Sequence, residues 1–112
     1  MKIKTLITAT LLALSLSMVA QSQVVSRAYE VSLSDFTAPV TEHGGASFKA
    51  CSSCERMLVR VTASTNYSIN GEAVRFADFR KVVMDIKSRG NADVIVLHHL
   101  ESDTIKSIRV SL

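Results

Sequence analysis

The stretch NYSINGEAVRFADFRKVVMDIKSRGN, residues 66–91, contains the change of hydrophobic period that decides the fold class. Tyr67 and Ile69 alternate with polar neighbours, which is the pattern of a half-buried strand. They lead into Asn70-Gly71, a dipeptide that favours a two-residue hairpin turn because both positions tolerate positive φ. After a short return strand the spacing of apolar residues becomes helical. The segment therefore predicts a β-hairpin followed directly by a helix.

The predicted helix has one apolar side. Its apolar stripe consists of Phe76, Phe79, Val82, Val83 and Ile86, and most of the charged residues lie opposite. Asp78 in the first turn suits the positive end of the helix dipole, and Lys87 and Arg89 suit its negative end. Gly90 is a typical C-terminal stop. The pattern predicts one helix over about residues 76–89, with its stripe packed against a sheet.

Strand-like segments lie on both sides of this hairpin and helix. Residues 29–34, 46–50 and 57–62 alternate apolar with polar side chains, and a loop over 35–45 contains the only proline. After the helix, 94–100 is apolar on both faces and predicts a central strand. A turn at 101–103 then leads to a last alternating strand that ends at Leu112.

This order of elements predicts an α+β, mainly β domain with five to six strands and one helix before a C-terminal β-hairpin. Two arrangements fit it. One is a small OB-like barrel, because the helix stands between the third and fourth major strands. The other is an open, curved antiparallel sheet with the helix packed on one face.

The segment LVRVTASTNYSINGEAVRFADF, with IKSIRV near the end, resembles small exported bacterial OB-like domains of unknown function. The shared features are a strand, a Thr, an NG turn, an apolar-x-x-Asp-apolar step and a final x-I-x-V strand. The resemblance covers about residues 58–112. This chain has a full helix where many such domains have a short Gly turn. The resemblance implies a small barrel-like fold, and it implies no ligand and no catalytic residue.

The N-terminus has the layout of a secretory signal peptide. Lys2 and Lys4 precede an apolar run from Leu6 to Val19 that is too short to span a bilayer, and small residues follow. Cleavage is expected after Ser22 or after Ala20. We therefore expect residues 1–22 to be removed and residues 23–112 to form a single small domain, periplasmic or secreted, without a membrane span.

Removal of the signal peptide changes the charge of the protein. Of thirteen Lys and Arg, eleven remain, against ten Asp and Glu, and these charges are scattered along the chain. A nearly neutral domain with few aromatic residues does not attract nucleic acid. The expected partner is instead an unknown protein, glycan or other envelope component.

Cys51 and Cys54 are the only cysteines, and Ser52 and Ser53 separate them. An exported protein with two cysteines close in sequence usually oxidises them. A thioredoxin-type thiol needs a helix N-terminus after the motif to stabilise the thiolate, whereas the residues after Cys54 are strand-like. The sequence therefore predicts a structural Cys51–Cys54 disulfide, with a thiol-redox role as the alternative.

A metal site is a further alternative. The two cysteines and Met57 recur at every third residue, and sulfur ligands suit Cu(I), so the alternative function includes copper handling. A structural zinc site would need His43, His98 or His99. His98 and His99 are adjacent on a predicted strand and point to opposite faces, which disfavours a joint site.

No arrangement of residues indicates an enzyme. The acidic residues are spread among turns and the helix, no serine lies in a G-x-S-x-G context, and Gly44-Gly45 has no following Lys and helix. The sequence therefore predicts a non-catalytic exported module without a cofactor, whose binding residues and ligand stay open.

Overall fold

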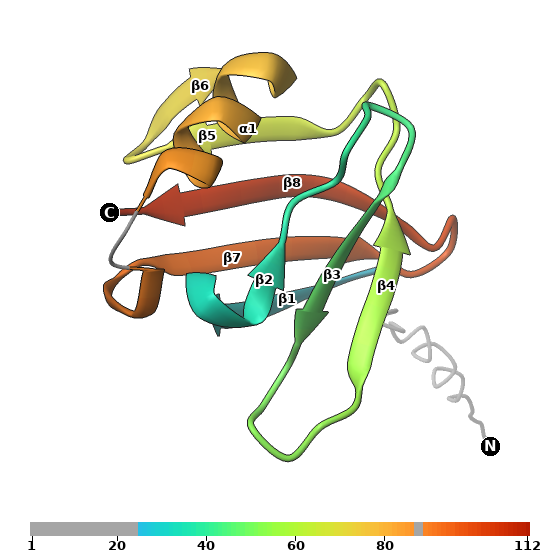
Figure 1. The fold of residues 1–112 in the computed structure, drawn as a ribbon. Coiled ribbons are helices and arrows are strands. Elements are labelled where there is room, and N and C mark those ends of the chain that lie inside the picture. The colour runs from blue at the N-terminus through green and yellow to red at the C-terminus, as the bar shows by residue number, and fades with distance from the viewer. Residues whose placement is uncertain (1–24, 87–88) are drawn as a thin grey trace, which may run out of the picture.

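The computed structural model describes residues 25–86 and 89–112 of the 112-residue chain. Figure 1 shows a β-rich domain with one α-helix at one end. The expected signal peptide lies outside the described residues. The elements are β1 (Ser26–Ser32), the 3₁₀ helix η1 (Leu33–Asp35), β2 (Phe36–Thr37), β3 (Gly45–Lys49), β4 (Arg56–Arg60), β5 (Asn66–Ile69), β6 (Glu72–Val74), α1 (Phe76–Asp85), the 3₁₀ helix η2 (Arg89–Asn91), β7 (Asp93–His99) and β8 (Thr104–Ser111).

The strands form one mixed sheet in which β8 is the branching point. One edge of β8 pairs antiparallel with β7, and β7 pairs antiparallel with β1. The other edge of β8 is shared: β4 meets it in parallel at Arg60↔Thr104, and β5 runs parallel to it over residues 66–69. From β4 the sheet continues to β3 and β2, and from β5 it continues to β6.

A turn between β4 and β5 keeps the chain beside β8. The backbone N–H of Thr65 donates to the carbonyl of Thr62 at 3.0 Å, and the N–H of Thr62 donates to Thr65 Oγ1 at 2.9 Å. The Thr65 hydroxyl in turn donates to the carbonyl of Ile105 at 2.6 Å. A side chain thus takes over a hydrogen bond to β8 where the strand itself is interrupted.

The sheet is not closed into a barrel, so the barrel expectation is wrong. No pairing within the described residues joins β1 to β2 or β3, although the Tyr29 and Phe48 rings approach to 5.5 Å between centroids. The open, mainly β α+β sheet is the arrangement observed. The expectation of five to six antiparallel strands is also wrong, since eight strands are described and β8 makes two parallel pairings.

The hairpin at Asn70-Gly71 and the C-terminal hairpin are confirmed. Asn70 and Gly71 both have positive φ, 51° and 87°, as the tight turn requires. Asn70 also ties this turn to β8, because its N–H donates to the carbonyl of Val110 and its Oδ1 accepts from the N–H of Leu112. β7 is central, as predicted, with β1 on one side and β8 on the other.

Helix α1 ends earlier than predicted. It stops at Asp85, and Ile86 is extended (φ −74°, ψ 129°) and packs against the core. Gly90 lies in the separate 3₁₀ turn η2, and Lys87 lies outside the described residues. The predicted orientation is nevertheless confirmed, because Phe79 and Val83 are fully buried whereas Lys81 is exposed.

Two local corrections concern the first strand and the loop after it. β1 ends at Ser32, and Leu33 is buried from η1 rather than from the strand. The Ser32 hydroxyl caps η1 by accepting from the N–H of Ser34 at 3.3 Å. Within the predicted 35–45 loop, Phe36 and Thr37 form a strand too short for periodicity to reveal.

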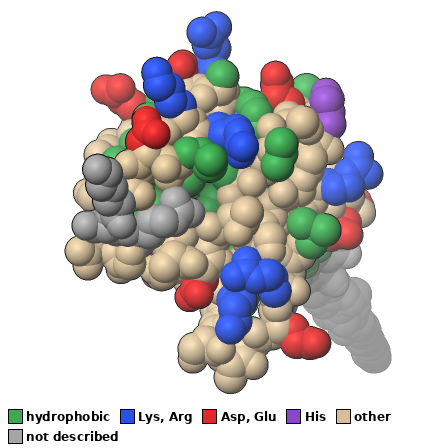
Figure 2. Space-filling model, viewed as in Figure 1, with side chains coloured by type: hydrophobic (Ala, Val, Ile, Leu, Met, Phe, Trp, Pro, Cys, Tyr) green, Lys and Arg blue, Asp and Glu red, His purple; other side chains and the backbone are tan. Residues whose placement is uncertain are grey.

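The core lies inside the curve of the sheet and is closed by α1. Its largest fully buried side chains are Phe48, Phe79, Leu33, Ile105, Ile108, Val61, Val83, Val94, Val96, Val110 and Pro39. On the face shown in Figure 2, Lys and Arg side chains are interspersed with Asp and Glu, and hydrophobic side chains lie between them. No helix in the described part of the chain is long and apolar enough to cross a membrane.

Candidate functional site

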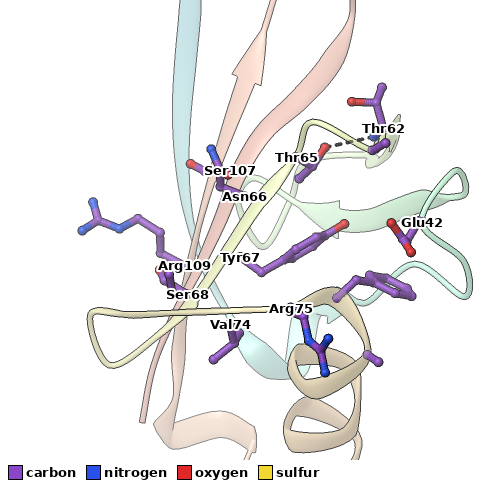
Figure 3. Close-up of a pocket in the computed structure, with 14 residues that line it drawn as sticks. Glu42, Thr62, Thr65, Asn66, Tyr67, Ser68, Val74, Arg75, Ser107 and Arg109 are labelled. Atoms are coloured by element: carbon purple, nitrogen blue, oxygen red, sulfur yellow. Dashed lines mark hydrogen bonds between the residues drawn. The ribbon is translucent and has the colours of Figure 1, made fainter.

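A groove of about 750 Å³ lies between the β5–β6 hairpin, the start of α1 and the loop before β3. We call it the Tyr67 groove (Figure 3). Its lining residues are Glu42, Thr62, Ala63, Thr65, Asn66, Tyr67, Ser68, Ala73, Val74, Arg75, Phe76, Ala77, Ser107 and Arg109. Its volume lies in the range of sites that hold small ligands or short peptide segments.

Tyr67 anchors the groove through its ring. Tyr67 lies on the core face of β5, because side chains of a strand point to alternate faces, and only 6% of its surface is exposed. The ring centroid lies 4.8 Å from that of Phe79 and 5.5 Å from that of Phe76, both from α1. The tilted packing of these three rings holds the Tyr67 hydroxyl in place.

The Tyr67 hydroxyl is buried, and it has no hydrogen-bond partner among the described residues. In Figure 3 the side chain points along the groove toward Glu42. Burial, with a smaller contribution from the Glu42 carboxylate, raises the pKa of Tyr67 to about 12. The hydroxyl therefore stays protonated at physiological pH. Its donor and its acceptor lone pairs are not used by any described residue.

Glu42 is held over the groove by contacts of its own loop. The N–H of Gly44 donates to the carbonyl of Thr41 at 3.1 Å, and the N–H of Val61 donates to the carbonyl of Gly44 at 2.8 Å. On the other side, the Arg80 guanidinium from α1 donates to the carbonyl of Pro39 at 3.1 Å. The loop that carries Glu42 is thus fixed both to Val61, directly after β4, and to the helix.

The two arginines that line the groove do not converge on the Tyr67 hydroxyl. Arg109 projects from the opposite face of the sheet, as its register partner Ser68 does, because neighbouring residues of β5 point to alternate faces. The Arg75 side chain points away from the hydroxyl in Figure 3, and its Nε lies 3.8 Å from Asp78 Oδ2. Glu42 is therefore the charged group that faces Tyr67.

The predicted disulfide between Cys51 and Cys54 is present, with Cα atoms 5.0 Å apart. It lies in the connection between β3 and β4, at the tip of a hairpin that extends away from α1 in Figure 1. The N–H of Cys54 donates to the carbonyl of Cys51 at 3.1 Å, so the bridge closes a single turn. The chain continues into β4, and no helix N-terminus follows the motif.

The other sulfur and imidazole candidates do not gather around the cysteines. Met57 lies on β4 and packs against the core. His43 is exposed in the loop before β3. His98 lies on the buried face of β7 and His99 on the other face, as predicted. His98 Nε2 lies 2.7 Å from Asp103 Oδ1, and His99 Nδ1 lies 2.9 Å from Ser102 Oγ. The described residues contain no group of three His, Cys, Asp or Glu side chains placed to hold a metal ion.

The His99–Ser102 contact belongs to the β7–β8 turn. It lies beside a smaller pocket of about 310 Å³. The backbone N–H of Ser102 also donates to His99 Nδ1, at 3.3 Å, and Ser102 Oγ lies 2.7 Å from Thr104 Oγ1. The residues that line this pocket include no carboxylate, and the contacts of His99 Nδ1 are with Ser102 of the same turn.

Neither Glu42 nor Tyr67 was identified as a site residue from the sequence. Glu42 is one acid in a loop, and Tyr67 is an ordinary apolar position of a strand. The available signal was Tyr67 itself, because a tyrosine on the core face of a strand brings a hydroxyl that needs a partner. Comparison with known proteins finds no matching family model, no matching curated protein and no matching solved structure.

Proposed function

We propose that this protein is an exported, non-catalytic binding module that holds an envelope or extracellular component in the Tyr67 groove. The observation that carries the proposal is the buried Tyr67 hydroxyl, which faces the groove without a protein partner. An unsatisfied buried hydroxyl costs free energy, and a bound ligand that hydrogen-bonds to it recovers that cost.

The chemistry of the groove supports binding rather than catalysis. With its pKa raised to about 12, Tyr67 is a poor base at physiological pH. Thr65 uses its hydroxyl within the fold, to donate to Ile105 and to accept from Thr62. The Thr65 hydroxyl is therefore engaged in the fold and not activated as a nucleophile.

Export is part of the same proposal. The basic start and apolar run of residues 1–22 support it, and so does the disulfide, because such bonds persist in the periplasm and outside the cell. The NG turn, the apolar-x-x-Asp-apolar step and the final x-I-x-V strand within residues 58–112 support a distant relation to small exported OB-like domains, here with an open sheet.

A thiol-redox or copper-handling function is the second candidate. The exposed position of Cys51 at a hairpin tip favours it, because a partner could reach the bridge there. The strand that follows the motif weighs against it, since no helix dipole would lower a thiol pKa. The Tyr67 groove therefore remains the preferred site.

The test is a titration of the ¹⁵N-labelled protein, followed by NMR, with peptides of either charge and with soluble peptidoglycan fragments. We expect at least one class to shift the backbone amides of Glu42, Thr65 and Ala77. The amides around Cys51 and Cys54 serve as the internal control and should not move. Shifts confined to the cysteine loop, or no shift in the groove with any ligand, would refute the proposal.

A further inference from the structure

The direction of the charged side chains decides what the Tyr67 groove attracts. Two arginines and one glutamate line the groove, so its lining as a whole carries a positive net charge. Near the Tyr67 hydroxyl the charge is negative, because Arg109 lies on the other face of the sheet and Arg75 points away (Figure 3). Arg75 is also close to Asp78, which offsets part of its charge. Around the Tyr67 hydroxyl the groove is therefore acidic, through Glu42.

The uncharged groups of the groove suit the same kind of ligand. Phe76 is partly exposed and contributes an aromatic ring beside Tyr67. An aromatic face attracts an ammonium or guanidinium group. The Tyr67 oxygen has free lone pairs, so it accepts a hydrogen bond from a cationic N–H while it donates its own proton to a ligand carbonyl.

We infer that the Tyr67 groove binds a lysine or arginine side chain of a partner protein, with Glu42 as the counter-ion, Phe76 as the aromatic wall and Tyr67 as a hydrogen-bonding group. This inference rests on the proposed binding function. A protein side chain is preferred over a small free cation because the groove places an aromatic ring and a hydroxyl beside the Glu42 carboxylate. The alkyl stem of a lysine or arginine covers such a ring while its charged end reaches the carboxylate. The backbone next to the basic residue supplies the carbonyl for the Tyr67 hydroxyl.

The experiment uses four blocked pentapeptides of the form acetyl-GGXGG-amide, in which X is Arg, Lys, Gln or Glu, together with spermidine. Each is titrated into the ¹⁵N-labelled protein, and its dissociation constant is determined from the chemical-shift changes of the backbone amides that line the groove. We expect the Arg and Lys peptides to bind about tenfold or more tightly than the Gln peptide, because a hydrogen bond to a charged group is worth more than a neutral one. The Glu peptide should not bind.

Variants assign the effect to the groove. Glu42→Gln removes the charge in an exposed loop and should reduce the preference for Arg over Gln to near unity. The matched control is Glu72→Gln, an exposed carboxylate on β6 that does not line the groove, and it should keep the wild-type preference. Tyr67→Phe should weaken the binding of the Arg peptide severalfold. The NMR spectrum of this variant should stay as dispersed as that of the wild type, which shows that the fold is intact.

Each outcome decides the inference. Equal binding of the Arg and Gln peptides, or an unchanged preference in Glu42→Gln, overturns it. Spermidine that binds as tightly as the Arg peptide overturns the assignment to a protein side chain. Groove shifts with peptidoglycan fragments or the Glu peptide alone would refute the cationic ligand but leave the binding function standing. No groove shift with any ligand would refute both.

Discussion

At the scale of single residues, Tyr67 combines a ring that packs in the core with a polar hydroxyl group. Its ring belongs to the core, between β5 and the first turns of α1, whereas its hydroxyl is left without a partner among the described residues. Phenylalanine would fill the same space without that cost. Tyr67→Phe should therefore fold with unchanged or slightly higher stability at neutral pH, and a hydroxyl kept despite this cost is consistent with use by a ligand.

Stability at alkaline pH tests the environment of Tyr67. Its pKa is about 12 in the folded protein and about 10 in the unfolded chain. Between these values unfolding releases a proton, so the contribution of Tyr67 is complete below about pH 10 and is lost as pH rises toward 12. The free energy of unfolding should fall with pH more steeply in the wild type than in Tyr67→Phe, by at most about 1.4 kcal/mol per pH unit.

Urea unfolding of both proteins at pH 9, 10 and 11 measures this difference. Comparison with Tyr67→Phe removes the effect of every other group that titrates in the range. Parallel pH dependences would show that the folded protein does not hold Tyr67 neutral. The sequence could not predict this environment, because it depends first on burial of Tyr67 against α1 and, to a smaller extent, on Glu42 from a loop 25 positions earlier in the chain.

At the scale of elements, local sequence patterns were sufficient to predict the structure where the residues of one short segment determine its conformation. Asn70-Gly71 takes the positive φ at both positions that the dipeptide favours, and the Phe79 and Val83 spacing correctly identifies the buried side of α1. The end of α1 was not predictable, because Ile86 leaves the helix to pack against the core. The interruption between β4 and β5 likewise depends on a distant group, the carbonyl of Ile105.

The buried side of α1 gives a prediction with a matched control. Phe79 is fully buried and its ring contacts that of Tyr67, so Phe79→Ala should lower the free energy of unfolding by about 3–5 kcal/mol. Lys81→Ala, two residues away on the exposed side, should change it by less than about 0.5 kcal/mol. Chemical denaturation of both variants measures the difference. Similar losses from the two would mean that the helix packs through another face.

At the scale of the whole molecule, sequence patterns gave the order of elements but not the pairing of the strands. Alternation in residues 66–69 shows that a strand exists there, yet nothing in it says that β5 runs parallel to β8 and antiparallel to β6. The branch at β8 then leaves β1 and β2 as separate edges, and the sheet stays open. The Tyr67 groove depends on the same long-range arrangement, because its walls come from the β3 loop, the β5–β6 hairpin and α1.

The position of the disulfide in this architecture leads to the last prediction. The bridge joins residues three apart, so chain entropy gives it about 2 kcal/mol at most. That is a useful share of the stability of a small domain. β3 separates the Cys51–Cys54 turn from the loop that carries Glu42, because one follows the strand and the other precedes it. The Cys51→Ser/Cys54→Ser variant should therefore melt at a lower temperature but bind ligands in the Tyr67 groove as the wild type does.

Calorimetry and the peptide titration measure these two effects on the same samples. A structural bridge also predicts that the purified wild type has no free thiol, holds no stoichiometric metal and does not reduce insulin with dithiothreitol as the electron source. The strand after Cys54 gives the reason, because it provides no helix N-terminus to stabilise a thiolate. Insulin reduction at the rate of a thioredoxin, or a tightly held copper ion, would assign function to the cysteine turn. Loss of groove binding in the double variant, with the fold intact, would show that the two sites are coupled through β3.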